Sequence, residues 1–297
     1  MPNPEATVLK TLLGRSPRTE ALIDGQVRSD RLALDFDDVR PTTNGFPAMV
    51  REMAYDFGEL ALLTFLQARA AGKPLVLLPF VAVAEPLHDY VYYNGDRGEL
   101  TPERVAGKRI GVRSYTQTTG LWVRGFLEDD HGVPLEAQRW ISVQEPHVRE
   151  YREPDFLERA PKGSDLLQML IDGEIDVLVG LQPAIAAQHP QLRRLFPEGA
   201  AEEWSRRTGI LPINHMAVLK QSLHDQSPEY ARELFRMLSE SKMLGMAAGS
   251  RDNWPSGIEA NRRGMELLVR WAVRQQLIPE AVQIDALFDE VTRGLGA

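Results

Sequence analysis

A polar loop that leads straight into a helical pattern is the first place where this sequence offers chemistry. After the apolar segment 107–112 the chain reads Arg113-Ser114-Tyr115-Thr116-Gln117-Thr118-Thr119 and continues into a helix-like stretch at 118–132. The N-terminus of a helix has unpaired backbone N–H groups and a partial positive charge, which favour carboxylates and phosphates. With Arg113 beside it, the loop predicts an anion-binding site. The alternative is that Thr116 or Thr118 only caps the helix and Arg113 is solvated.

A second group of cations and hydroxyls follows the first apolar segment, at 7–13. Arg15, Ser16, Arg18 and Thr19 open the next element there. Their position resembles that of the loop at 113–119, so they predict a second contact for an anion.

An amide and an imidazole interrupt an apolar run near the two-thirds point of the chain. Asn214 and His215 precede the apolar residues 216–219. A strand buried on both faces stays apolar, and a strand with one wet face alternates, but this segment does neither. A lone histidine beside a strand is more often a packing residue than a catalyst. The neighbouring Pro212 indicates a change of direction, however, and the polar pair is predicted to face a ligand.

Other motifs exclude several chemistries. Asp35, Asp37 and Asp38 could suggest a hard-metal site, but no calcium-loop spacing follows, and a solvated strand end is the preferred interpretation. Phosphate-binding loops, dinucleotide fingerprints and nucleophile elbows are absent from the sequence, as are helical histidine pairs. The sequence does not indicate a divalent metal and leaves that question open.

Composition narrows the class of partner and the location. The net charge of -8 and the lack of a long basic run argue against nucleic acid and anionic membranes as partners. The chain has 0 cysteines, which excludes disulfides and thiolate chemistry. No export signal and no run of about 18 apolar residues is visible, so we expect a cytoplasmic protein.

The elements that must position these residues alternate in an α/β rhythm. Strand-like segments lie at 7–13, 31–36, 74–80, 90–93, 107–112 and 174–180. Helix-like segments lie at 58–72, 118–132, 164–173, 227–249 and 258–277. The turn-rich stretch 94–107 predicts a crossover between two lobes, lobe 1 being 1–100 plus 216–297 and lobe 2 being 101–215. We expect a ligand cleft between the lobes, with His215 where the second lobe returns to the first.

The sequence resembles the 4,5-dihydroxyphthalate decarboxylase family over nearly its whole length. The similar stretches, in the same order, are 16–27, 49–74, 107–134, 166–180, 209–219 and 253–268. The resemblance implies an α/β, two-lobed fold like that of type 2 periplasmic solute-binding proteins, in a cytoplasmic enzyme. The positions that match the family are Arg18, Thr19, Arg51, Asp56, Glu59, Tyr115, Thr118, Trp122, Arg124, Gly125, Gly173, Glu174, Asp176 and His215.

One segment departs from the family pattern. The family has a Pro-Ser-Arg run that leads to Phe-Arg-His, whereas residues 80–88 read FVAVAEPLH. His88 is kept, but the arginines that could hold a second carboxylate are absent. The resemblance therefore implies a dihydroxyphthalate-like acid and leaves the exact substrate open.

The implied reaction defines the roles that the residues must fill. Loss of CO2 from a hydroxylated aromatic acid needs a proton on the ring carbon that bears the carboxylate, and the ring hydroxyls supply the electrons, so no organic cofactor is obligatory. His215 is suited to the role of proton donor, because the unperturbed pKa of a histidine side chain lies near neutral pH. Glu59 and His88 are suited to act as a base or as a hydrogen-bond partner for a ring hydroxyl. The predicted substrate-binding residues are Arg18, Thr19, Arg113, Tyr115, Gln117, Thr118, Thr119 and Asn214.

The sequence leaves two alternatives open. The chain could be a solute-binding protein or sensor for a small aromatic carboxylate, without chemistry of its own. It could also be another lyase on the same scaffold, for instance one that acts on a chorismate-derived acid. A homo-oligomer is left open by the sequence.

Overall fold

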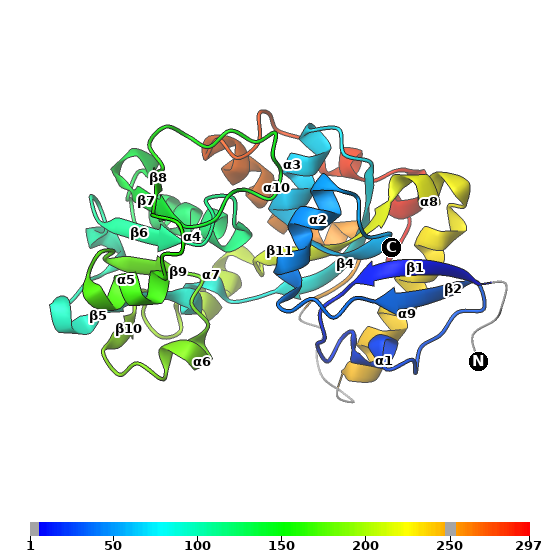
Figure 1. Ribbon diagram of the computed structural model, residues 1–297, viewed down its shortest axis with the longest axis horizontal. Coiled ribbons are helices and arrows are strands. Elements are labelled where there is room, and N and C mark those ends of the chain that lie inside the picture. The colour runs from blue at the N-terminus through cyan, green and yellow to red at the C-terminus, as the bar shows by residue number, and fades with distance from the viewer. Residues whose placement is uncertain (1–5, 247–253) are drawn as a thin grey trace. The chain divides into compact units, whose positions relative to one another are not determined.

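The computed structural model describes residues 6–246 and 254–297 and divides the chain into two compact units. Unit 1 consists of Met1–Ala84, Ile213–Glu266 and Glu280–Ala297, and unit 2 consists of Glu85–Pro212 and Leu267–Pro279. Figure 1 shows the elements of both units.

The unit boundaries differ from the predicted ones. Strand β4 (Leu75–Ala84) runs to the end of the first segment of unit 1, and the predicted crossover at 94–107 lies inside unit 2. The reason is that β5 (Val91–Asn94) pairs with strands of the second sheet. The return crossover falls before Ile213 rather than after His215, so His215 belongs to unit 1.

Unit 1 is built on a five-stranded sheet with the order β2-β1-β3-β11-β4. Strand β1 is parallel to β2 and β3, whereas β11 is antiparallel to β3 and β4. The strands are β1 (Thr7–Leu12), β2 (Leu32–Phe36), β3 (Phe57–Ala61), β4 and β11 (Ile213–Lys220). The helices are α1 (Glu20–Ile23), α2 (Phe46–Arg51), α3 (Leu62–Ala70), α8 (Gln221–Gln226), α9 (Glu229–Gly245), α11 (Glu290–Arg293) and the first part of α10 (Ile258–Arg274). Short 3-10 turns lie at η1 (Thr42–Gly45) and η6 (Ile284–Leu287).

The core of unit 1 explains why its central strands are almost wholly apolar. Leu78 and Phe80 of β4 and Ala217 of β11 pack with Leu234 and Leu238 of α9. Figure 1 shows α1 and α9 on the opposite side of these strands from α2 and α3. Strands covered on both faces read as continuous hydrophobic runs.

The predicted helix at 58–72 is wrong over its first residues. Residues 57–61 form β3, and the helix α3 begins only at Leu62. Every residue of β3 is buried, and α3 is buried along most of its length, so no periodicity in the sequence separates the strand from the helix. The difference matters because Glu59 lies on this central strand.

Unit 2 is built on a six-stranded sheet with the order β10-β5-β9-β6-β7-β8. Strands β9, β6, β7 and β8 are parallel, and β5 is antiparallel to both β9 and β10. The remaining strands are β6 (Arg109–Val112), β7 (Arg139–Ser142), β8 (Glu158–Arg159), β9 (Val177–Val179) and β10 (Leu192–Arg194). The helices are α4 (Thr118–Asp129), α5 (Leu166–Asp172), α6 (Pro183–Ala186) and α7 (Ala200–Thr208). The 3-10 turns are η2 (Leu87–Tyr90), η3 (Gly95–Arg97), η4 (Pro102–Arg104) and η5 (Leu135–Ala137).

Helix α4 is the buried helix of unit 2. Its aromatic side chains Trp122 and Phe126 contact the rings of Trp204 and Trp271. Gly125 lets Trp271 approach, because a Cβ at this position would lie 2.1 Å from the indole ring. The helix is thereby fixed at its middle, and its N-terminus follows directly from the loop after β6.

Two predicted features reach beyond the described residues. The predicted helix at 227–249 extends past residue 246, and the family-like stretch 253–268 starts one residue before the described part resumes. Within the described residues, no helix has both the length and the apolarity that crossing a membrane requires.

Candidate active site

Strands β3 and β11 place a carboxylate and an imidazole on the same face of the sheet in unit 1. His215 is paired with Ala61, and Ala217 is paired with Glu59, so the two functional residues are diagonal neighbours across the antiparallel pair. Diagonal side chains on one face lie within reach of each other. The sequence predicted both residues, and the structure brings them together.

The interruption of the apolar run at Asn214 and His215 is an irregularity in the pairing of β11 with β4. The register shifts between Ile213 and His215 and again between His215 and Met216, as in a β-bulge. Bulges re-aim side chains and often lie beside functional sites. The polar pair therefore stands where the ladder is locally disrupted rather than in a regular buried strand.

The His215 and Glu59 side chains form an ion-pair geometry without a hydrogen bond. His215 Nδ1 lies 3.7 Å from Glu59 Oε1, and the two side chains are 15% and 5% exposed. Within the described residues, Nδ1 is buried without a hydrogen-bond partner. The ring of Phe46, at the start of α2, meets the imidazole edge-on at a centroid distance of 5.1 Å. Phe46 thus limits the orientations of the imidazole ring. No sequence motif predicted this contact.

A glycine gives Glu59 the room that it occupies. A Cβ on Gly14 would lie 2.8 Å from Thr42 Oγ1 and 3.0 Å from Glu59 Oε1. Gly14 is itself held by Thr19, whose hydroxyl donates to the Gly14 carbonyl at 2.6 Å. The loop after β1, the turn η1 and strand β3 therefore converge beside the carboxylate. The sequence did not single out Gly14 or Thr42, since nothing local links either to residue 59.

The predicted second anion contact at 15–19 has a different structure from that of the first. Helix α1 is a single turn, and the Thr19 hydroxyl is engaged within the loop, where it also accepts the Ser16 N–H at 2.9 Å. Arg15 pairs with Asp24 at 2.7 Å, and the Arg18 guanidinium lies 4.2 Å from the centroid of the Trp254 ring. We therefore assign Thr19 to holding the loop, and a direct ligand contact by Arg18 stays a prediction.

Asn214 is buried next to the histidine. The residue is 7% exposed, and its Oδ1 has no hydrogen-bond partner among the residues that the structure describes. A buried amide oxygen without a partner is costly, so a ligand or a water is the expected donor.

The loop at 113–119, which the sequence predicts to bind an anion, runs from the end of β6 into α4. The residue before α4 is Gln117, and its side chain makes no capping hydrogen bond. The hydroxyl of Thr116 lies 3.1 Å from that of Ser114, and the buried Oγ1 of Thr118 has no partner in the described part of the chain. Neither threonine therefore caps the helix, and the N–H groups of the first turn, which include that of Thr119, have no intrahelical acceptor.

Two backbone contacts and a glycine shape this loop. The Arg113 carbonyl accepts hydrogen bonds from Val143 and Gln144, and burial lowers the pKa of the Arg113 guanidinium. Gly180, with a φ of +91°, makes room for the Gln117 side chain, because a Cβ there would lie 2.9 Å from its Nε2. The loop is thus fixed from both sides, and a preformed loop binds an anion at a lower entropic cost.

Tyr115 supports the loop rather than lining it. Its side chain is 0% exposed, and its hydroxyl donates to the Gln275 carbonyl at 3.3 Å. Burial raises the pKa of this phenol. The predicted contact between Tyr115 and a substrate finds no support in this environment.

His88 lies in the aromatic core of unit 2. It stacks on Phe126 at a centroid distance of 3.9 Å and meets Phe196 edge-on at 4.9 Å. Burial lowers its pKa to about 4, helped by the nearby His131 and Arg207. The residue is 4% exposed and enclosed by aromatic rings, so we assign His88 to packing, and a contact with a ring hydroxyl stays a prediction.

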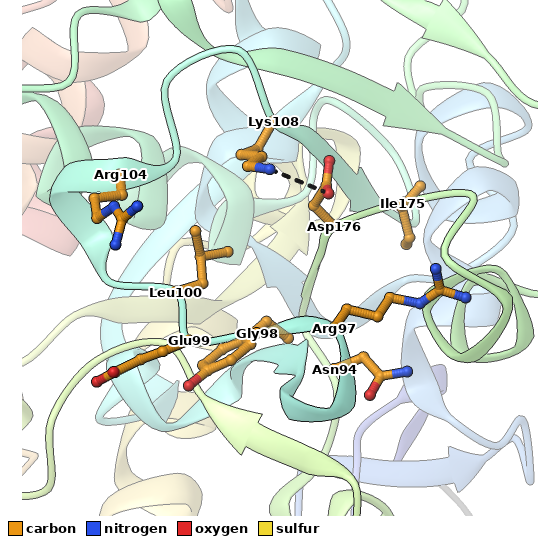
Figure 2. Close-up of a pocket in the computed structure, with 10 residues that line it drawn as sticks. Asn94, Arg97, Gly98, Glu99, Leu100, Arg104, Lys108, Ile175 and Asp176 are labelled. Carbon is orange, nitrogen blue, oxygen red and sulfur yellow. Dashed lines mark ion pairs between the residues drawn. The ribbon is translucent and has the colours of Figure 1, made fainter.

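A pocket of about 130 Å³ lies elsewhere on unit 2, near the N-terminal end of β6 (Figure 2). Its cations are largely engaged in the structure. Lys108 pairs with Asp176 at 3.7 Å, and Arg97 donates to the carbonyl oxygen of Asp172 at the end of α5 at 2.5 Å. Because the anion loop follows the other end of β6, this pocket is not part of the candidate active site.

Two of the acidic residues that follow β2 are paired with neighbouring side chains. Asp37 accepts a hydrogen bond from Tyr55 at 2.9 Å, and Asp38 pairs with Arg40 at 2.6 Å. Within residues 6–246 and 254–297, no group of three His, Asp or Glu side chains is placed to hold a metal ion.

Comparison with solved structures defines the class of fold. The periplasmic aliphatic sulphonate binding protein of Escherichia coli superimposes with a TM-score of 0.62 at 12% identity, over 97% of this chain and 92% of that protein. The alkanesulfonate-binding protein of Xanthomonas axonopodis pv. citri gives 0.61 at 11% identity, over 97% and 99%. A desulfurization enzyme, DSZB, gives 0.59 at 14% identity, over 96% and 97%. The predicted periplasmic-binding-protein-like α/β fold is confirmed, and it serves binding proteins and an enzyme alike, so the fold alone does not decide the function.

Sequence relatives identify the family. No protein-family model matches the chain. The 4,5-dihydroxyphthalate decarboxylase of Comamonas testosteroni is 32% identical over 256 residues, which cover 80% of this chain and 76% of the relative. That of Pseudomonas putida is 33% identical over 210 residues, which cover 67% and 81%. The chain belongs to the 4,5-dihydroxyphthalate decarboxylase family, as its sequence motifs predicted.

Proposed function

We propose that the protein is a carboxy-lyase that removes CO2 from a dihydroxylated aromatic carboxylic acid. Two family members at 32% and 33% identity are decarboxylases of this substrate class. The observation that carries the mechanism is the pair formed by His215 and Glu59, with 3.7 Å between Nδ1 and Oε1. No observation favours a binding protein without chemistry.

His215 is the proton donor in this proposal. Its Nδ1 faces Glu59, which leaves Nε2 to deliver the proton to the ring carbon that bears the carboxylate. The bond to the carboxylate then breaks, its electron pair restores the aromatic ring, and CO2 leaves. The imidazole, now neutral, takes up a proton from water before the next turnover.

Glu59 stabilises the charged form of the donor. The sequence assigned this residue to a ring hydroxyl, but its position beside Nδ1 suits it better as the counter-charge of the imidazolium. The Glu59 side chain is only 5% exposed, and attraction between charges is stronger away from water. The ring hydroxyls provide the electrons for the reaction, so the proposed steps draw on no organic cofactor.

The loop of unit 2 is the proposed site for a substrate carboxylate. The first turn of α4 offers N–H groups, Thr118 offers a buried hydroxyl without a partner, and Arg113 supplies a cation at the start of the loop. A small aromatic carboxylate is therefore the proposed ligand.

Release of CO2 tests the proposal. The purified protein is incubated with 4,5-dihydroxyphthalate and a panel of dihydroxybenzoates, and CO2 is measured beside ligand binding by thermal shift. We expect turnover of at least one acid and a loss of about 10²- to 10⁴-fold in kcat for His215→Gln, with the fold checked by circular dichroism. Binding without turnover of any acid, or full activity of His215→Gln, would contradict the proposal.

A cytoplasmic location stays a prediction. The family resemblance implies it, and cell fractionation with detection of the protein in the cytosolic and periplasmic fractions tests it.

A further inference from the structure

Arg124 is a completely buried guanidinium beneath the anion loop. Its side chain is 0% exposed, its Nε donates to Gln275 Oε1 at 2.7 Å, and its Nη2 donates to the Tyr115 carbonyl at 2.8 Å. The ring centroids of Tyr115 and Trp140 lie 4.0 and 4.7 Å from the guanidinium carbon. The residue therefore holds the middle of the loop by its backbone.

The charge of Arg124 has no acidic partner in the described residues. The groups that contact it are carbonyl oxygens and aromatic rings, and its Nη1 is buried without a hydrogen-bond acceptor. Burial lowers the pKa of Arg124, opposed only in part by the neighbouring phenols of Tyr115 and Tyr151. A buried charge without a counter-charge is unfavourable, so its position calls for an explanation.

The guanidinium lies against the first turn of α4. A Cβ on Gly120, the third residue of the helix, would lie 3.3 Å from Arg124 Nη1. The N-terminus of a helix already carries partial positive charge, and cations are favoured at the opposite end. Two sources of positive potential therefore meet at the start of α4, an arrangement that a bound anion would relieve.

We propose that Arg124 is a positioning residue that strengthens carboxylate binding at the start of α4 through its uncompensated charge. The guanidinium does so from beneath the loop, without touching the ligand. The inference rests on the proposed function only in taking the anion to be the carboxylate of the substrate.

Binding of benzoate and of its neutral analogue benzamide tests the charge directly. Affinities are measured by isothermal titration calorimetry for the wild type, Arg124→Met and Arg124→Lys. We expect Arg124→Met to weaken benzoate binding by roughly tenfold or more while benzamide binding changes little, and Arg124→Lys to retain most of the affinity. An equal loss for both ligands would show a purely structural role and would overturn the proposal.

Gln275→Glu provides a second variant in case Arg124→Met fails to fold. The substitution preserves the size of the side chain and places a carboxylate where the amide oxygen accepts from Arg124 Nε at 2.7 Å. The charge is then neutralised within the core, so benzoate affinity should fall roughly tenfold and rising salt should change it less than in the wild type. The substitution also removes the hydrogen bond from Gln275 Nε2 to the Leu121 carbonyl at 2.9 Å, so benzamide affinity, which should change little, is measured beside it. Unchanged benzoate affinity in this variant would overturn the proposal.

These measurements are independent of turnover. A chain that binds benzoate in this manner but releases no CO2 would contradict the proposed function alone. A wild type that turns over an acid but binds benzoate and benzamide equally well would contradict the role of Arg124 alone.

Discussion

His215 Nδ1 lies 3.7 Å from Glu59 Oε1 across the antiparallel strands β11 and β3. The distance exceeds that of a hydrogen bond, and both side chains are largely shielded from water. A small shift of the ring would convert the contact into a charge-assisted hydrogen bond once the imidazole is protonated. Catalytic contacts often tighten in this way when the substrate binds. The two residues are therefore expected to act as one unit.

Glu59→Gln tests this coupling. The amide keeps the shape of the side chain but removes the counter-charge of the imidazolium, so kcat should fall at least about tenfold. Because the two residues act through the same proton, the double variant with His215→Gln should be hardly slower than His215→Gln alone. The steady-state rate of CO2 release is measured for the wild type, both single variants and the double variant. Together these rates form a double-mutant cycle. Losses that multiply would show that Glu59 acts independently of His215.

The glycine beside the carboxylate gives a more local test. A methyl group at Gly14 would overlap Thr42 Oγ1 and press on Glu59 Oε1, at 2.8 and 3.0 Å. We expect Gly14→Ala to lower kcat at least about fivefold, since active-site geometry is sensitive to shifts of this size. Gly294→Ala is the matched control, because its Cβ would meet only the Val291 carbonyl, at 3.8 Å. Equal activity of the two variants would contradict the placement of Glu59.

The sequence predicted most of the fold but not all of the site. The strands at 7–12 and 109–112 and the helix at 118–129 stood out because turn-rich segments bound their apolar runs. Strand β3 was missed because burial on every side erases the periodicity that separates strand from helix. Among candidate site residues, the loop at 113–119 stands out, since a hydroxyl-rich segment before a helix is a local signal, and its binding of an anion stays a prediction.

The missed residues share one physical cause. Phe46, Gly14 and Thr42 approach His215 and Glu59 from elements that are distant from them in sequence. The sequence around His88 likewise does not indicate the aromatic rings that surround it in the fold. Contacts of this kind depend on tertiary packing, which local patterns do not encode.

Gly125→Ala probes the packing that holds α4. The new methyl group would lie 2.1 to 2.4 Å from atoms of the Trp271 indole, and neither the helix nor the ring has free space to yield. Overpacking of this kind costs roughly 1–3 kcal/mol, so the midpoint of urea unfolding should fall clearly below that of the wild type. Gly294→Ala again serves as the control, and a midpoint equal to that control would contradict the close contact.

The pH dependence of stability follows from His88. Its pKa is about 4 in the folded chain because burial disfavours the charged ring, whereas an exposed histidine titrates near 6.5. Between these two values the unfolded chain binds the extra proton, so the contribution of His88 is complete above pH 6.5 and is lost as the pH falls toward 4. The expected loss is about 3 kcal/mol, from 1.36 kcal/mol per pKa unit.

His88→Phe isolates this contribution. Phenylalanine keeps an aromatic ring against Phe126 and Phe196 but cannot take up a proton. Urea unfolding at a series of pH values should show the free energy of unfolding of the wild type falling by about 3 kcal/mol more than that of the variant between pH 8 and pH 4. Groups that titrate in both proteins cancel in the difference. Parallel curves for the two proteins would mean that His88 is open to protonation in the folded state, and would return it to the list of candidate ligand contacts.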